Sequence, residues 1–199
     1  MAERQGPWAG VDVGGTRKGF DVAVVHVHEL RDVARGCHSA EAVLQMLRPY
    51  SPKVVAVDSP CSAAPLGRTL REGERALRAA VCGIRWTPDR ASLDGGNPYY
   101  EWIRLGFDLY NALEREGWNW IEVFPTASWT RWAGPRQGSR ASWTTAALAK
   151  LGLRQLPART TQDVRDAIAA AVTARQYSIG ETETFESIVV PRSGLPIRK

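Results

Sequence analysis

The sequence predicts an α/β fold in which a five-stranded mixed sheet carries helices on both faces. Three strand-like runs joined by short links occupy residues 8–38, and this order predicts an antiparallel meander. A helical pattern and a nearly continuous apolar run follow, which is typical of a crossover to parallel strands four and five. The chain has 199 residues, enough for one domain that buries a substantial core.

The first three strands are indicated by their apolar runs and by the glycines between them. Residues 8–15 predict a short buried strand that ends at Gly14-Gly15, and the turn GGTRKG leads into the run GFDVAVVHV. The segment from Glu29 to His38 alternates apolar and polar residues, so it predicts the third strand.

The next segment predicts a helix and then the fourth strand. Ser39 can cap the helix SAEAVLQMLRPY, and Pro49 and Pro52 end it. The run KVVAVDSP is nearly continuously apolar, as expected of a central strand covered on both faces. A right-handed crossover places this strand beside the first and parallel to it, so Asp12 and Asp58 are expected to be neighbours.

Residues 61–97 predict an insertion made of loops and one helix. Thr69 and Glu72 form a capping box for this helix, which is expected to run to about Ala80. Asn97-Pro98 then opens the long helix PYYEWIRLGFDLYNALEREG. Loops as long as the rest of this insertion are often functional in compact domains.

The C-terminal part of the chain supplies the last predicted strand and further helices. NWIEVFPTASW predicts the fifth strand, which Pro125 stops, while TASWTRWAG and SRASWTTAALAKLG predict two helices. Residues 181–199 form a C-terminal extension, in which TFESIVVP predicts one last strand or an extended edge.

The helix predicted between Thr160 and Tyr177 carries two acids at its leading end. Thr160 can cap it, and Asp163 suits the positive end of the helix dipole. Asp163 and Asp166 are three residues apart and project from one face, and the alanines that follow can pack closely on a sheet. The helix would then aim both acids at the strand ends. The alternative is that they serve only the helix N-terminus.

Three more acids lie inside apolar strand-like runs: Asp12, Asp58 and Glu122. Burying a carboxylate there is costly unless something positive pairs with it, and no matching set of buried lysines is present. A divalent cation could neutralise these carboxylates together, and hard oxygen ligands favour magnesium or manganese. The alternatives are that Asp12 and Asp58 are turn-forming acids and that Glu122 pairs with an arginine.

Composition indicates a reduced intracellular protein with a basic surface. The formal net charge is +5 and the isoelectric point is about 9.4, which suits a polyanionic partner without requiring one. Eight tryptophans are expected to be mainly core or pocket walls, and some could stack on bases. Cys37, Cys61 and Cys82 form no CxxC pair, which indicates neither disulfides nor zinc.

The N-terminal sequence MAERQGPW has no apolar signal region, and no run approaches the roughly 20 apolar residues of a membrane span. A cytoplasmic protein without a membrane partner is therefore expected.

The order of strands, helices and acids resembles the ribonuclease H-like pattern. DVRDAIAAA resembles the closing motif of RuvC-type resolvases, in which a helix brings the last acid to the metals. Over nearly its full length the chain also resembles the family called domain of unknown function 429, whose members are predicted to be ribonuclease H-like nucleases. The matching segments are GVDVGG, VVAVDSP, EGERALRAAVCGIRWTP, IEVFPTA and DVRDAIAAAVTA.

This resemblance implies a hydrolase, a metal-dependent nuclease that cleaves DNA or RNA and that could pair into a homodimer. The implied metal-site candidates are Asp12, Asp58, Glu122, Asp163 and Asp166. Related nucleases usually need four acids, and the preferred catalytic four here are Asp12, Asp58, Glu122 and Asp166, which leaves the role of Asp163 open.

The hypothetical mechanism places two divalent ions, magnesium or manganese, about 4 Å apart and bridged by Asp12. Basic side chains in loops near the strand ends could hold flanking phosphates, although each is equally well explained as solvated surface charge. These candidates are Arg17, Lys18, Arg68, Arg71 and Arg90.

Two other functions remain open. Residues 12–16, DVGGT, look like the first phosphate loop of the sugar-kinase and actin superfamily, which would make the chain an ATP-binding phosphotransferase or ATPase. Those enzymes need two such domains and this chain has the length of one, so this function is disfavoured. The second alternative is a non-catalytic nucleic-acid-binding domain that keeps the fold.

Overall fold

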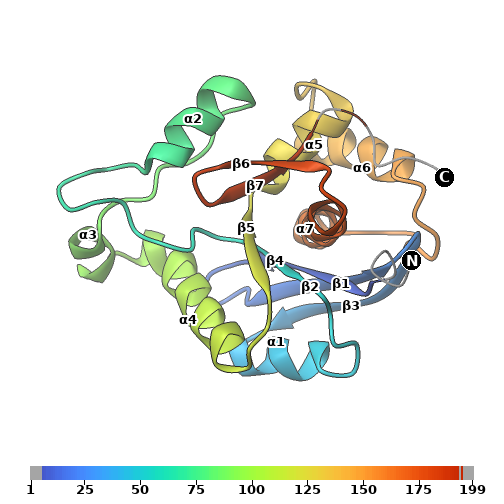
Figure 1. Cartoon of the computed structure of the whole chain (residues 1–199), viewed down its shortest axis with the longest axis horizontal. Coiled ribbons are helices and arrows are strands. Elements are labelled where there is room, and N and C mark those ends of the chain that lie inside the picture. The colour runs from blue at the N-terminus through green and yellow to red at the C-terminus, as the bar shows by residue number, and fades with distance from the viewer. Residues whose placement is uncertain (1–5, 193, 195–199) are drawn as a thin grey trace.

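The computed structural model of the chain describes residues 6–192 and Gly194 and contains one seven-stranded mixed sheet (Figure 1). The strand order is β3-β2-β1-β4-β5-β7-β6. The strands are β1 Trp8–Val13, β2 Phe20–His26, β3 Glu29–Cys37, β4 Val55–Asp58, β5 Trp120–Val123, β6 Thr182–Phe185 and β7 Ile188–Pro191. The helices are α1 Ala40–Leu47, α2 Glu72–Ala80, α3 Arg90–Asp94, η2 Pro98–Tyr100, α4 Glu101–Arg115, α5 Pro125–Ala133, α6 Arg140–Lys150 and α7 Gln162–Ser178.

The α/β class, the antiparallel meander β1–β3 and the parallel central strands are confirmed, but the prediction of five strands is wrong. The segment TFESIVVP reverses direction at Glu186 and Ser187 and forms the hairpin β6–β7. Glu186 adopts the left-handed backbone conformation that the turn requires, with φ 57°. The turn therefore lacks the glycine that usually indicates a hairpin in a sequence. Strand β7 then pairs in parallel with β5 and extends the sheet.

The predicted crossover brings β4 beside β1 in parallel. The register pairs Gly10 with Ala56 and Asp12 with Asp58, so the expectation that these two aspartates are neighbours on adjacent strands is confirmed. On its other side β1 is antiparallel to β2.

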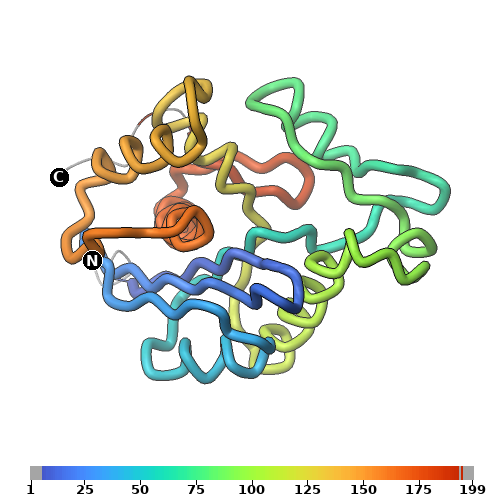
Figure 2. Tube along the Cα trace, turned by 180° about the vertical axis from the view of Figure 1, so that it is seen from behind, coloured from blue at the N-terminus to red at the C-terminus, as the bar shows by residue number. Residues whose placement is uncertain are grey.

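Helix α7 lies in the hollow of the twisted sheet. Figures 1 and 2 show it between the β1–β3 meander and the β6–β7 hairpin, and it contacts all seven strands. Its alanines pack closely enough that a Cβ added at Gly10 of β1 would lie 2.1 Å from the carbonyl oxygen of Ala167. The helix is capped by the side chain of Thr161, which accepts a hydrogen bond from the Val164 amide, and not by Thr160 as predicted.

The two faces of the sheet carry separate cores. The α7 face is closed by α5 and α6, which bring Trp129, Trp132 and Trp143 into the core, while α1 and α4 cover the opposite face. No helix in the described part of the chain is long and apolar enough to cross a bilayer.

Residues 61–100 form a lobe beside the sheet that contains α2, α3 and η2 (upper right in Figure 2). The N-cap of helix α2 is Arg71, whose backbone amide and guanidinium both donate to the Glu74 carboxylate, and not Thr69 as predicted. The short helix α3, which the sequence did not indicate, is capped by the Asp89 side chain.

We predict that Gly10→Ala lowers the free energy of unfolding by about 3 kcal/mol, because the added methyl group would collide with the backbone of α7. Thermal unfolding measures this. The matched control is Gly83→Ala, where an added Cβ would meet nothing within 4 Å, so the change is expected to be neutral. Equal stability of the two variants would contradict the close packing of β1 on α7.

Candidate functional site

Two of the predicted acids project from the α7 face of the sheet. Along a strand the side chains alternate between faces, and both Trp8 and Gly10 of β1 lie on the α7 side, so Asp12 does too. On β4, Ala56 belongs to the core on the α7 side, which places Asp58 on the same face. Asp12 and Asp58 therefore lie side by side at the ends of their strands, below the start of α7.

The first turns of α7 bring Asp163 and Asp166 to the same place. Together with Asp12 and Asp58 they line a cleft of about 1000 Å³. Asp166 is 3% exposed and Asp163 is half-buried. All five predicted acids line this cleft, and these four come from three elements that are far apart in sequence.

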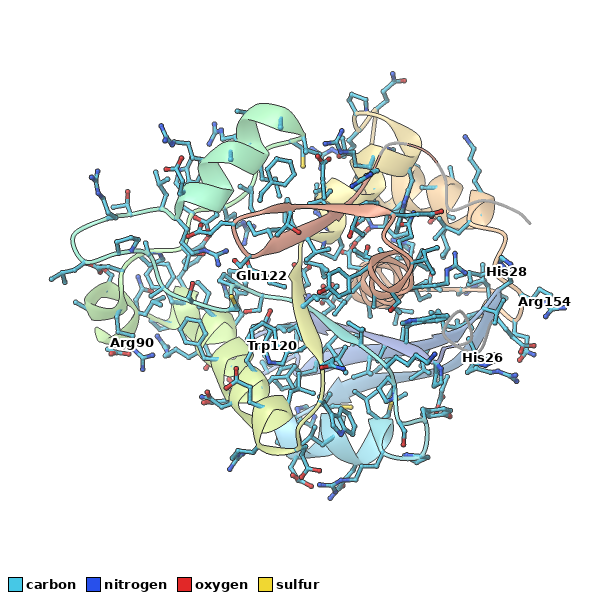
Figure 3. All side chains as sticks on the ribbon, in the orientation of Figure 1. His26, His28, Arg90, Trp120, Glu122 and Arg154 are labelled. Carbon is cyan, nitrogen blue, oxygen red and sulfur yellow. The ribbon has the colours of Figure 1, made fainter. Side chains whose placement is uncertain are left out.

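Glu122 lines the same cleft from the other face of the sheet, where it is paired with Arg71. Its neighbours Ile121 and Val123 belong to the core on the α7 side, so Glu122 and Trp120 project from the other face of β5 (labelled in Figure 3). Glu122 is 3% exposed and forms a salt bridge with Arg71, and its Oε2 also accepts a hydrogen bond of 2.8 Å from Ser187. Although burial acts to raise its pKa, the Arg71 hydrogen bonds and charge hold that pKa below the usual range.

Arg71, one of the candidates for phosphate binding, belongs to this buried network. It is 2% exposed, and its guanidinium also bonds Glu74 at 3.0 Å. Glu74 accepts two further hydrogen bonds, from the amide and the hydroxyl of Thr87. The network lines the far wall of the cleft and attaches the lobe to β5.

Asp12 and Asp58 carry the strongest electrostatic strain in the cleft. Burial raises the pKa of Asp12 well above its ordinary value, and the charges of Asp58, Asp166 and Asp163 raise it further. The pKa of Asp58 is likewise raised by burial first and by Asp166 next, with Arg140 opposing. Neither aspartate forms a salt bridge with any described residue.

Asp166 is held in place by three side chains that the sequence did not point to. One oxygen accepts a hydrogen bond of 2.8 Å from the indole N–H of Trp129, and the other accepts one of 2.9 Å from Arg140. The Gln162 amide, one helical turn earlier, lies 3.0 Å from both oxygens. Because Trp129 is fully buried, its ring fixes the direction of this carboxylate.

The predicted basic residues divide between the cleft and other places. Lys18 lines the cleft and bonds Asp163 at 2.8 Å, and this hydrogen bond and charge raise the pKa of Lys18. Arg17 and Arg68 are exposed in loops, and Arg90 pairs with Asp94 on α3. The cleft is also lined by three arginines that were missed in the sequence, Arg85, Arg136 and Arg140. In the sequence, only the basic character of the segments around these arginines points to them.

The acids have the donor chemistry for a hard divalent cation. Among the described residues no group of three or more His, Cys, Asp or Glu side chains is arranged closely enough to hold a metal as they stand. Asp12 and Asp58 nevertheless form a pair of buried carboxylates without a salt bridge to a described residue. A cation bound between them would offset the burial and the neighbouring negative charges that raise their pKa values. The residues therefore fit such an ion, with Asp163 and Asp166 beside it.

The DVGGT loop is closed by a carboxylate of α4. Both the amide and the hydroxyl of Thr16 donate to Glu101, at 2.9 and 2.8 Å, and the Gly14 amide donates to the carbonyl of Gly19. These are donors that a phosphate-binding loop would direct at its nucleotide.

Comparison with known proteins identifies the fold. No family model and no curated protein matches the chain. It is similar to the structure of Thermus thermophilus RuvC in complex with a Holliday junction substrate, with 15% identity, 86% of this chain and 94% of that chain covered and a TM-score of 0.55. Another T. thermophilus RuvC structure matches at 18% identity, with 86% and 95% covered and a TM-score of 0.49. The fold is therefore RuvC-like, within the ribonuclease H-like class.

We predict that Asp12→Asn makes the metal-free protein more stable at neutral pH. A raised native pKa means that the folded protein binds more protons than the unfolded one, so wild-type stability falls as pH rises from about 4 through the native pKa. The variant escapes this loss, which is about 1.4 kcal/mol when the native pKa lies one pH unit above the unfolded pKa. Urea unfolding in EDTA at several pH values measures it. A variant less stable than wild type at neutral pH would contradict the electrostatic strain.

Proposed function

We propose that this protein is a metal-dependent nuclease that hydrolyses phosphodiester bonds in the cleft. The observation that carries the proposal is the convergence of Asp12, Asp58, Asp163 and Asp166 at the strand ends of a RuvC-like fold. The Holliday junction belongs to the RuvC complex, and it supports a nucleic-acid substrate here without deciding between DNA and RNA. Membership of the domain of unknown function 429 family and a homodimer are further parts of this proposal.

Asp12 and Asp58 would hold a magnesium or manganese ion, and Asp163 and Asp166 would complete the site, with Asp12 shared if two ions bind. Such an ion supplies a water of lowered pKa and offsets the charge that develops on the phosphate. We leave Glu122 outside the ligand set, because it projects from the other face of β5 and its buried charge is already compensated by Arg71.

The basic side chains of the cleft would position the substrate. Arg140 and Trp129 direct Asp166, while Lys18 holds Asp163. Arg85 and Arg136 line the same cleft without a salt bridge to any described residue, so they are available to bind phosphates on either side of the scissile bond.

The phosphotransferase alternative is less well supported. Glu101 already takes the Thr16 amide and hydroxyl, so a nucleotide phosphate would have to displace a carboxylate from the DVGGT loop. A non-catalytic nucleic-acid-binding domain would not need two buried carboxylates with raised pKa values at the strand ends.

The test is a cleavage assay with single-stranded, duplex and branched DNA and RNA in magnesium, manganese or EDTA. We expect metal-dependent cleavage that falls at least about 100-fold in Asp12→Asn and in Asp166→Asn, because each change removes a carboxylate ligand. Asp108→Asn, on the exposed surface of α4, is the matched control and should cleave like wild type.

Undiminished cleavage by both site variants would refute the proposal. Tight ATP binding with hydrolysis and no cleavage would favour the phosphotransferase. Metal-independent, strongly salt-dependent binding without cleavage would favour the non-catalytic domain.

A further inference from the structure

The lobe of residues 61–100 exposes large apolar side chains beside the cleft. Trp86 is 37% exposed, Tyr99 is 54% exposed, and Leu66 in the preceding loop is 88% exposed. Aromatic rings of this size contribute most to stability when they are buried, so two of them exposed in one small lobe suggest a binding role.

Each exposed ring lies against an arginine. The guanidinium carbon of Arg78 is 4.8 Å from the centre of the Trp86 ring, and that of Arg85 is 6.0 Å from the centre of the Tyr99 ring. Neither arginine forms a salt bridge with a described residue. Aromatic faces combined with unpaired cations are the two components with which proteins bind single-stranded nucleic acid.

The charge of the lobe favours a polyanion over an apolar protein partner. Its exposed acids are already used, since Glu72 pairs with Arg75 and Asp94 with Arg90. The exposed cations without such a pair are Arg68, Arg78 and Arg85. The lobe therefore presents an uncompensated positive surface around its exposed rings.

The two exposed rings lie close to the part of the cleft through which a bound nucleic-acid strand would extend away from the acids. Arg85 lines the cleft that contains Asp12 and Asp58. Trp86 is the next residue in the chain, and the Tyr99 ring lies against the guanidinium of Arg85. Trp102, one helical turn after Tyr99, lines the cleft as well. A strand whose phosphate reaches the acids would thus pass Arg85 and come within reach of both exposed rings.

We propose that this lobe binds unpaired nucleotides next to the scissile phosphate, with Trp86 and Tyr99 stacking on bases and Arg78 and Arg85 contacting the backbone. This inference rests on the proposed nuclease function and specifies its substrate as one with a single-stranded segment. Because every base has an aromatic face, the stacking is tolerant of sequence. DNA and RNA share this chemistry.

The test measures binding of short labelled oligonucleotides by fluorescence anisotropy in EDTA, so that cleavage does not interfere. Single-stranded DNA and RNA are compared with their duplexes. We expect Trp86→Ala and Tyr99→Ala each to weaken single-strand binding about 10-fold and duplex binding much less. Trp86→Phe should restore most of the affinity, and Arg85→Gln should lower the salt dependence by about one released ion.

Tyr177→Ala is the matched control, because Tyr177 is 45% exposed at the far end of α7 from the acids. It should bind like wild type. If both lobe variants bind with wild-type affinity, or lose affinity equally for single strands and duplexes, the inference about the lobe is overturned. In that case, cleavage by the wild-type protein would still support the nuclease function. A wild type that neither binds nor cleaves any of these nucleic acids would overturn both. The nucleic acid that binds more tightly, DNA or RNA, shows which type of sugar the lobe prefers.

Discussion

The contact between the backbones of β1 and α7 at Gly10 is the constraint on which the cleft depends. Because no side chain separates the strand from the helix there, the first turn of α7 comes down onto the strand ends. Asp163 and Asp166 then face Asp12 and Asp58, which the parallel pairing of β1 with β4 holds side by side. The small residues of β1 and α7 thus place the acids, although none of them takes part in chemistry.

The structure contains two kinds of buried carboxylate with opposite energetics. Glu122 is paired with Arg71 and hydrogen-bonded to its surroundings, so its charge is compensated within the protein. Asp12 and Asp58 are neighbours without a salt bridge to a described residue, and their raised pKa values reflect burial first and repulsion from nearby carboxylates next: Asp58 for Asp12, and Asp166 for Asp58. Asp12 and Asp58 therefore gain most from an added cation, whereas the charge of Glu122 is already compensated.

Much of this arrangement could be predicted from sequence because it follows from general rules. The handedness of crossovers made Asp12 and Asp58 neighbours, and helical spacing put Asp163 and Asp166 on one face. The face of the sheet from which Glu122 projects depends on how β5 pairs with β4, and the run WIEVFP alone does not reveal that pairing. The β6–β7 hairpin was missed because Glu186 turns the chain without a glycine. Trp129 and Arg140 reach Asp166 only through tertiary packing.

The most direct test of a cation site beneath α7 is manganese binding measured by calorimetry on wild type, Asp12→Asn and Glu122→Gln, each first shown to be folded by circular dichroism. We expect binding at one or two sites in the wild type, loss of binding in Asp12→Asn, and near wild-type affinity in Glu122→Gln, because Glu122 is engaged by Arg71 on the other face of the sheet. Unchanged binding in Asp12→Asn, or no binding by the wild type, would contradict the claim that the acids beneath α7 form a cation site.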